Sequence, residues 1–155
     1  SYNNIGNTYF ILKKYEKAII YFNKAIKINP SLKESYYNKG KIFYEKGEYE
    51  KSIYYYNLAL KNDKNYFEAI INRGISQSKL LNYADAEKDF LTAISLNPLS
   101  GSALFNLSVL YFHQKKFIKS LVLVDKAIEL GFVVDSLFRE DIIKNINKIY
   151  NNKSL

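Results

Sequence analysis

The chain has 155 residues, of which 48% are hydrophobic and 25% charged, and its formal net charge at pH 7 is +8. This composition excludes the disordered class, whose chains bury too little apolar surface to offset the entropy of ordering. No apolar run reaches the roughly 18 residues of a membrane-spanning helix, and no secretory leader pattern opens the sequence. The sequence holds neither cysteine nor methionine. We therefore expect a fragment of a longer, intracellular protein, located in the cytoplasm.

Pairs of helices are predicted along most of the chain, because apolar residues recur at helical spacing on both sides of short polar turns. The turns are expected at Lys13-Lys14, Lys46 to Glu48, Leu81-Asn82 and Lys115-Lys116. Prolines 30 and 98 end two of the helices, since proline lacks the N–H donor and pushes its predecessor out of the helical region. The expected first helices of the pairs are 2–13, 34–46, 67–80 and 101–114, and the second helices are 16–28, 49–61, 83–95 and 117–130.

A single helix is predicted after the last pair. Asp135-Ser136 can cap a helix over 135–151, in which the apolar residues Phe138, Ile142, Ile146 and Ile149 share one side. We interpret 135–155 as a capping helix and tail that cover the last pair, because arrays of helix pairs need a polar end to remain soluble.

The pairs are copies of one unit that repeats every 34 residues. Asparagine stands at positions 4, 38, 72 and 106. A column of small residues in the first helices faces a column of bulky residues in the second helices, which indicates close helix crossings. The small column is Gly6, Gly40, Gly74 and Ser108, and the bulky column is Phe22, Tyr56, Phe90 and Val124. Such a period predicts a solenoid in which each unit buries its apolar face against its neighbours.

The first unit resembles the tetratricopeptide repeat at every position of that family's signature: Tyr2, Ile5, Gly6, Tyr9, Ala18, Phe22, Ala25 and Pro30. Later units depart from the signature at single places, with Lys39 and Arg73 for leucine, Gln77 for tyrosine and Lys64 for proline. The resemblance implies an all-α, right-handed superhelical solenoid of antiparallel helix pairs, with four repeats at about 1–32, 33–66, 67–100 and 101–134. It also implies a non-catalytic scaffold that binds an extended or helical segment of a partner protein.

The same resemblance implies that the first helix of each repeat lines a concave groove. An asparagine amide can pair with both the C=O and the N–H of a peptide, so the four asparagines could form a ladder along a ligand backbone, similar to the ladder in the O-linked N-acetylglucosamine transferase. The asparagines could equally serve only to tie adjacent helices together, and the sequence leaves both interpretations open. We expect Asn38 and Asn72 to be the central contacts. The candidate groove residues are Asn4, Asn7, Asn38, Lys41, Ile71, Asn72, Phe105 and Asn106.

A second device of the family is the carboxylate clamp, which holds the C-terminal carboxylate of heat-shock chaperones. The resemblance implies Lys, Asn, Asn, Lys and Arg at five groove places. These places hold Asn3, Asn7, Asn38, Glu68 and Asn72, so all three cations are missing. The sequence therefore predicts that this chain does not bind chaperone tails in the manner of the clamp.

Catalytic and metal-binding chemistry has few candidate residues. The only histidine, His113, falls in a helical segment, and no glycine-rich phosphate loop or nucleophile-elbow sequence occurs. One histidine without cysteine makes a poor transition-metal site. We expect no enzyme activity, no cofactor and no metal.

The positive charge raises a nucleic-acid alternative, in which a lysine-rich surface binds RNA or another acidic partner. Of the 23 basic residues 21 are lysine, whereas base edges and bidentate phosphate contacts favour arginine. Most lysines fall in the second helices and turns. We therefore expect them on a solvated outer surface.

Overall fold

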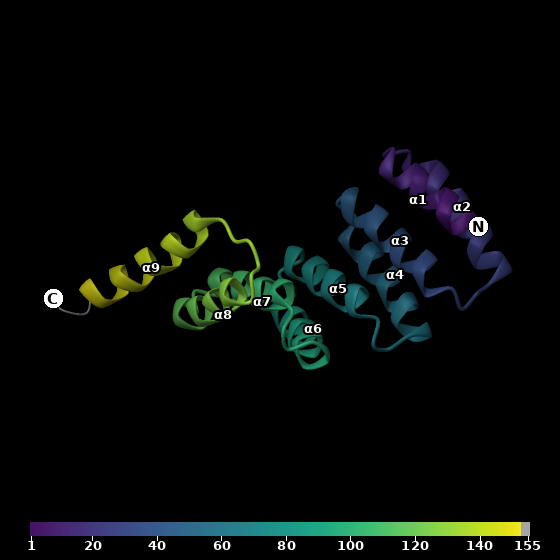
Figure 1. Ribbon diagram of the computed structural model, residues 1–155. Coiled ribbons are helices and arrows are strands. Elements are labelled where there is room, and N and C mark those ends of the chain that lie inside the picture. Colours follow the sequence, from purple (N-terminus) through teal and green to yellow (C-terminus); the bar gives the residue numbers. More distant parts are fainter. Residues whose placement is uncertain (153–155) are drawn as a thin grey trace. The chain divides into compact units, whose positions relative to one another are not determined.

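A computed structural model describes residues 1–152, and along these residues the chain forms nine α-helices and no strand (Figure 1). The last residues of the predicted tail, 153–155, lie outside the described residues. The helices are α1 Tyr2–Ile11, α2 Tyr15–Ile28, α3 Lys33–Glu45, α4 Tyr49–Asn62, α5 Phe67–Lys79, α6 Tyr83–Leu96, α7 Gly101–His113, α8 Phe117–Glu129 and α9 Ser136–Asn151. Each begins and ends within two residues of the helix that the sequence predicts.

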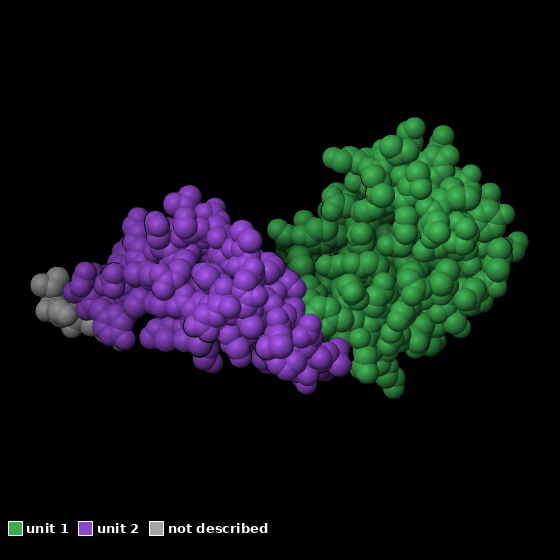
Figure 2. All heavy atoms as spheres, in the orientation of Figure 1, with its two compact units in different colours: residues 1–82 green, residues 83–155 purple. Residues whose placement is uncertain are grey.

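The chain divides into two compact units, Ser1–Asn82 and Tyr83–Leu155, which Figure 2 colours separately. Unit 1 contains the pairs α1–α2 and α3–α4 together with α5. Unit 2 contains α6, the pair α7–α8 and α9. In unit 1 each helix packs against the next one along the chain, as expected for stacked helix pairs.

Two aromatic rings fill the core of unit 1, and each faces a glycine. Phe22 and Tyr56 are fully buried. A Cβ atom added to Gly6 would lie 2.5 Å from Cε1 of Phe22, and one added to Gly40 would lie 2.5 Å from Cε1 of Tyr56. The predicted crossing of small and bulky columns is therefore confirmed in both repeats of this unit, because only a glycine lets the ring approach the first helix this closely.

Lys39 and Arg73, which stand where the family signature has leucine, have a shared structural reason. Lys39 Nζ donates to Asn23 Oδ1 at 2.8 Å, and Arg73 Nη1 donates to Asn57 Oδ1 at 2.6 Å. Both bonds run from a first helix to the second helix of the preceding repeat, at equivalent positions 34 residues apart. A cation–amide hydrogen bond thus takes the place that an apolar contact would otherwise fill.

In unit 2 a serine pair joins α7 to α8. Ser108 Oγ donates to the Ser120 carbonyl oxygen at 2.7 Å, and Ser120 Oγ donates to the Ser108 carbonyl oxygen at 2.9 Å. Both side chains are buried. Each hydroxyl is satisfied by the opposite backbone, so the pair holds the two helices at the close approach that glycine permits in unit 1.

Helix α9 is held on α7 and α8 by one ring and one ion pair. The Phe138 ring lies 5.6 Å from the Phe105 ring and 5.4 Å from the Phe112 ring, both on α7. Arg139 donates from Nε to Asp125 Oδ1 on α8 at 2.7 Å. Ile142 is fully buried, and Asp135 caps the helix by accepting from the Leu137 N–H. These contacts support our interpretation of α9 as a capping helix.

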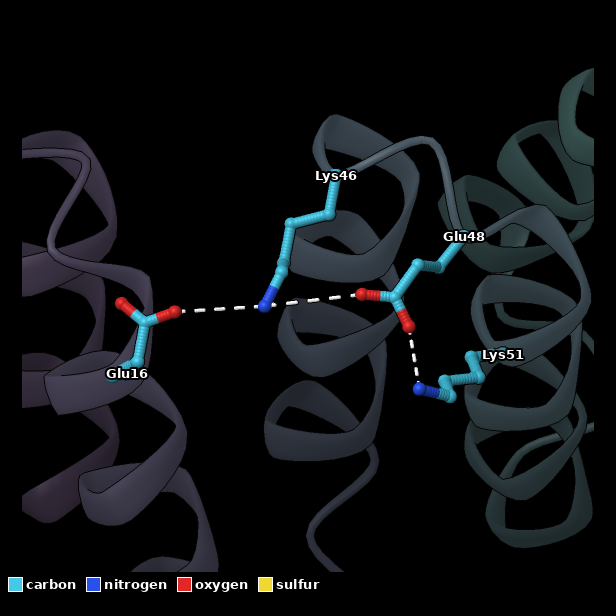
Figure 3. A network of polar contacts seen from close by, with 4 residues as sticks. All are labelled: Glu16, Lys46, Glu48 and Lys51. Atoms are coloured by element: carbon cyan, nitrogen blue, oxygen red, sulfur yellow. Dashed lines mark hydrogen bonds and ion pairs between the residues drawn. The ribbon is translucent and has the colours of Figure 1, made fainter.

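A chain of exposed ion pairs links three helices of unit 1 (Figure 3). Lys46 lies 3.5 Å from Glu16 and 3.8 Å from Glu48, and Glu48 also pairs with Lys51. The hydrogen bond from Lys51 holds the pKa of Glu48 below its ordinary value. A depressed carboxyl pKa stabilises the fold at neutral pH, and this contribution is lost as the pH falls through the folded-state pKa. Because the groups are exposed, solvent keeps the effect small.

The turns between first and second helices place one residue in the left-handed region. Lys13 has φ 55° and the equivalent Gly47 has φ 74°. A side chain costs about 1 kcal/mol there, and glycine avoids that cost. We expect Lys13→Gly to raise the free energy of unfolding by about 1 kcal/mol and Gly47→Ala to lower it by about 1 kcal/mol. Chemical denaturation followed by far-UV circular dichroism would measure the free energy of unfolding of both variants.

The two variants form a matched pair, since a Cβ atom on Gly47 would meet no atom within 4 Å and the effect is one of backbone conformation alone. Equal signs for the two substitutions would contradict the assigned turn geometry.

Candidate functional site

A small pocket opens between α3 and α5 of unit 1, on the first helices that were predicted to line a groove. Its volume is about 150 Å³, similar to that of an engineered protein cavity that binds benzene. It is therefore the size of an anchoring side chain. The lining residues are Lys41, Tyr44, Glu45, Tyr56, Asn72 and Ile75. We call it the α3–α5 pocket.

One rim of this pocket carries both signs of charge. Lys41 and Glu45 stand one helical turn apart on α3. Lys41 Nζ lies 4.6 Å from the ring centroid of Phe10 and 5.6 Å from that of Tyr37, so aromatic rings hold its charge in place. Glu45 is exposed. The rim can therefore pair with a positive or a negative charge on a ligand.

The opposite wall presents Asn72, whose amide is oriented by a tyrosine. Asn72 Nδ2 donates to the Tyr37 hydroxyl at 2.8 Å. The Tyr37 ring contacts Tyr56 at 5.8 Å and Tyr66 at 5.2 Å. Burial raises the pKa of the Tyr37 hydroxyl, so it remains protonated at neutral pH and its oxygen accepts from Asn72. An amide has a second N–H and an oxygen, which leaves Asn72 with groups for a ligand.

Asn38 has a different environment from Asn72. Its side chain is buried, and Nδ2 donates to Asn3 Oδ1 at 3.4 Å. Ser35 Oγ donates to the same oxygen at 3.0 Å. This cluster ties α3 to α1. The sequence left open whether the asparagines bind a ligand or tie adjacent helices together. At Asn38 the structure contains a hydrogen bond of the second kind.

The other predicted groove residues are distributed over both units. On α1, Asn4 is exposed and Asn7 half-buried, while Ile71 is buried on α5. Asn106 lies in unit 2 and donates from Nδ2 to the Ser102 carbonyl oxygen of its own helix at 2.8 Å. Phe105, also in unit 2, contacts the rings of Phe132 and Phe138. The α3–α5 pocket brings together two of the predicted residues, Lys41 and Asn72.

Tyr44 belongs to this pocket and was not among the predicted residues. It lies three residues after Lys41, and that helical spacing alone places it on the same side of α3. Burial raises the pKa of its hydroxyl. The tyrosine stands outside the asparagine column from which the groove was predicted, and only its spacing from Lys41 signals its place in the pocket.

The groups that a clamp would need are engaged or of the wrong sign. Asn3 accepts from Ser35 and Asn38, and Glu68 is exposed on α5. Among residues 1–152 no group of three histidine, cysteine or carboxylate side chains could hold a metal ion. Within the same residues, no helix is both long and apolar enough to cross a bilayer.

The predicted outer lysines are exposed. This set consists of Lys14, Lys17, Lys24, Lys27, Lys46, Lys51, Lys61, Lys115, Lys116, Lys119 and Lys126. Several of them cover aromatic rings, for example Lys24 over Tyr21 at 5.0 Å and Lys51 over Phe43 at 5.4 Å. The Phe43 ring also stacks on Tyr55 at 5.1 Å, so these rings are already in contact with protein groups.

Three family profiles described as tetratricopeptide repeat match residues 1–32, 33–66 and 71–130. The chain belongs to the tetratricopeptide repeat family. The first two matches each cover one unit of the 34-residue period, and the third spans most of the remaining two units. The fold class is confirmed as an all-α solenoid of antiparallel helix pairs.

Solved structures share this fold. The first repeat domain of Spaghetti (RPAP3), bound to the HSP90 peptide SRMEEVD, superposes with a TM-score of 0.70 at 23% identity, over 74% of this chain and 90% of that one. The MamA protein gives a TM-score of 0.76 at 19% identity, over 99% and 90% of the two chains. The repeat domain of Arabidopsis OM64 gives 0.68 at 27% identity, over 72% and 93%. No curated protein sequence matches the chain.

Proposed function

We propose that this chain is a non-catalytic interaction module, and that the α3–α5 pocket receives one side chain of a peptide segment from a partner protein. The observation that carries the proposal is the pocket itself, in which Lys41, Glu45 and Asn72 surround an opening floored by Tyr56 and Ile75. Ligand sites in proteins combine an apolar floor with a few polar groups that fix orientation, and this pocket has both.

The pocket is supported by residues that are already held in place. Asn72 is oriented by Tyr37, and Lys41 by the rings of Phe10 and Tyr37. A preformed receptor loses little entropy on binding, so the ligand carries most of the ordering cost. Asn72 can offer its free N–H and its oxygen to a ligand backbone, while an apolar ligand side chain lies against Ile75 and Tyr44. Asn4 and Asn7 would extend the groove within unit 1, whereas Ile71 is buried.

The Spaghetti domain is bound to the HSP90 peptide SRMEEVD, but we infer that this chain takes a different ligand. Glu68 would repel a terminal carboxylate, and the asparagines at two of the clamp places, Asn3 and Asn38, bond to one another. None of the five clamp places holds a cation, so a carboxylate bound at these places would lose its hydration without compensation from them.

The test begins with peptides selected from a displayed random library against the full chain, followed by affinity measurements on a selected fluorescent peptide. We expect Lys41→Glu and Asn72→Ala each to weaken binding by about tenfold, as hot-spot contacts do. The matched control is Lys61→Glu, the same charge reversal at an exposed site on α4, and it is expected to change affinity by less than about twofold.

Circular dichroism melting of each variant separates lost binding from lost structure, which matters for Asn72 because of its bond to Tyr37. Equal affinity of the three variants and the unmodified chain would contradict the pocket as the binding site. Binding of single-stranded RNA that competes with the peptide would support the lysine-surface alternative instead.

A further inference from the structure

Unit 2 has a second opening, remote in sequence from the α3–α5 pocket, between the start of α8 and the end of α9. Its volume is about 400 Å³. Ile118 on α8 and Ile146 and Ile149 on α9 supply its apolar walls. Ile118 is 59% exposed and Ile149 43% exposed, although both are large aliphatic residues. We call this opening the α8–α9 pocket.

The rim of the α8–α9 pocket is positively charged, although Glu87 of α6 accepts from the Tyr111 hydroxyl at 2.7 Å, on the ring that Lys116 and Lys119 cover. Lys115, Lys116 and Lys119 line it. Among residues 1–152 none of the three forms an ion pair, and the segments 115–124 and 142–152 contain no acidic residue. Exposed apolar walls beside unpaired like charges indicate a surface that an acidic, apolar ligand would complement.

We propose that the α8–α9 pocket is a docking site for an acidic amphipathic helix of a partner protein. Two helices already flank the opening, and a third helix laid between them would bury its apolar side against Ile118, Ile146 and Ile149 while its carboxylates face the lysines. A second copy of this chain fits less well. The chain carries +8, and its own exposed apolar end, at Tyr2 and Ile28, is flanked by Lys24 and Lys27.

The repeat itself supplies a matched control for this site. Lys13, Lys14 and Lys17 occupy the same repeat positions in the first repeat as Lys115, Lys116 and Lys119 in the fourth. Even the ring contact is preserved, since Lys17 Nζ lies 5.6 Å from the Tyr9 centroid and Lys119 Nζ 5.5 Å from the Tyr111 centroid. Only the fourth repeat has the isoleucines of α9 beside the three lysines.

The experiment titrates the full chain with a fluorescent synthetic helix of about 15 residues, with leucines along one side and glutamates on the other. A peptide with glutamine in place of glutamate is the ligand control. We expect saturable binding of the acidic peptide. Reversing Lys115, Lys116 and Lys119 to glutamate should weaken that binding at least about tenfold, whereas reversing Lys13, Lys14 and Lys17 should change it by less than about twofold.

A variant with unchanged net charge tests whether the apolar walls of the pocket contribute to binding. Ile118→Ser/Ile149→Ser changes exposed positions, so the fold is retained, and we expect about tenfold weaker binding.

Equal losses of peptide affinity in the two lysine-reversal variants would overturn the proposal, because they would show attraction by net charge alone. Unchanged binding in the isoleucine variant would overturn it too. So would capture by phosphatidylglycerol vesicles through Lys115, Lys116 and Lys119 without binding of the acidic peptide, an outcome that would assign the pocket to anionic lipid.

Discussion

Tyr56→Ala is expected to lower the free energy of unfolding of unit 1 by about 3–5 kcal/mol, the range for removing a large buried aromatic side chain. The ring is 1% exposed, lies against Gly40 and contacts the Tyr37 ring at 5.8 Å. Its removal leaves a cavity between α3 and α4, beside the Tyr37 ring. The chain contains no tryptophan, so urea denaturation would be followed by far-UV circular dichroism.

Tyr54 on the same helix provides the control for this substitution. It is 57% exposed, so Tyr54→Ala removes a ring of the same size from the surface, and we expect a loss below about 1 kcal/mol. A similar loss for Tyr54→Ala and Tyr56→Ala would mean that the core of unit 1 is not arranged as described.

Gly40→Ala is expected to destabilise unit 1 by about 1–3 kcal/mol, although alanine is the better helix former by about 1 kcal/mol. The added Cβ atom would lie 2.5 Å from Cε1 and 2.6 Å from Cδ1 of Tyr56. Because the ring is buried and contacts the Tyr37 ring at 5.8 Å, moving it away from the added methyl group disturbs the packing of α3 on α4. Urea denaturation of the variant measures the cost.

The double variant Gly40→Ala/Tyr56→Leu isolates this steric cause. A shorter aliphatic side chain leaves room for the methyl group, so the second substitution should cost less in the Gly40→Ala background than in the unmodified chain. Strictly additive free energies would contradict a clash between these two residues.

The sequence predicts the helices well because each of them is specified by local and repeated signals. Pro30 ends α2, the small and bulky columns meet at Gly40 and Tyr56, and Asp135 caps α9 as expected. The resemblance to the tetratricopeptide repeat family was confirmed by the family profiles. Because the same pattern recurs every 34 residues, each helix type is predicted from several copies, which reduces the chance of assigning an element wrongly.

The candidate site is less predictable because it depends on which side chain reaches which partner. The sequence treats Asn38 and Asn72 as equivalent, yet Asn38 bonds to Asn3 while Asn72 bonds to Tyr37. The hydrogen bonds that explain why Lys39 and Arg73 replace leucine join residues 16 positions apart in sequence. The sequence of a single helix does not indicate such bonds. Such pairings follow from the packing of one repeat on the next.

The central claim is that a partner segment binds at the α3–α5 pocket of unit 1. The most direct measurement places a photoreactive benzoylphenylalanine at position 44 of the chain, irradiates it with a library-selected peptide bound, and identifies the cross-linked residues by mass spectrometry. The chain with the same group at the exposed position of Tyr54 serves as the reference. We predict efficient cross-linking from position 44 to one residue of the peptide and none from position 54. A bound peptide that cross-links equally from both positions, or from neither, would contradict the assignment of the site.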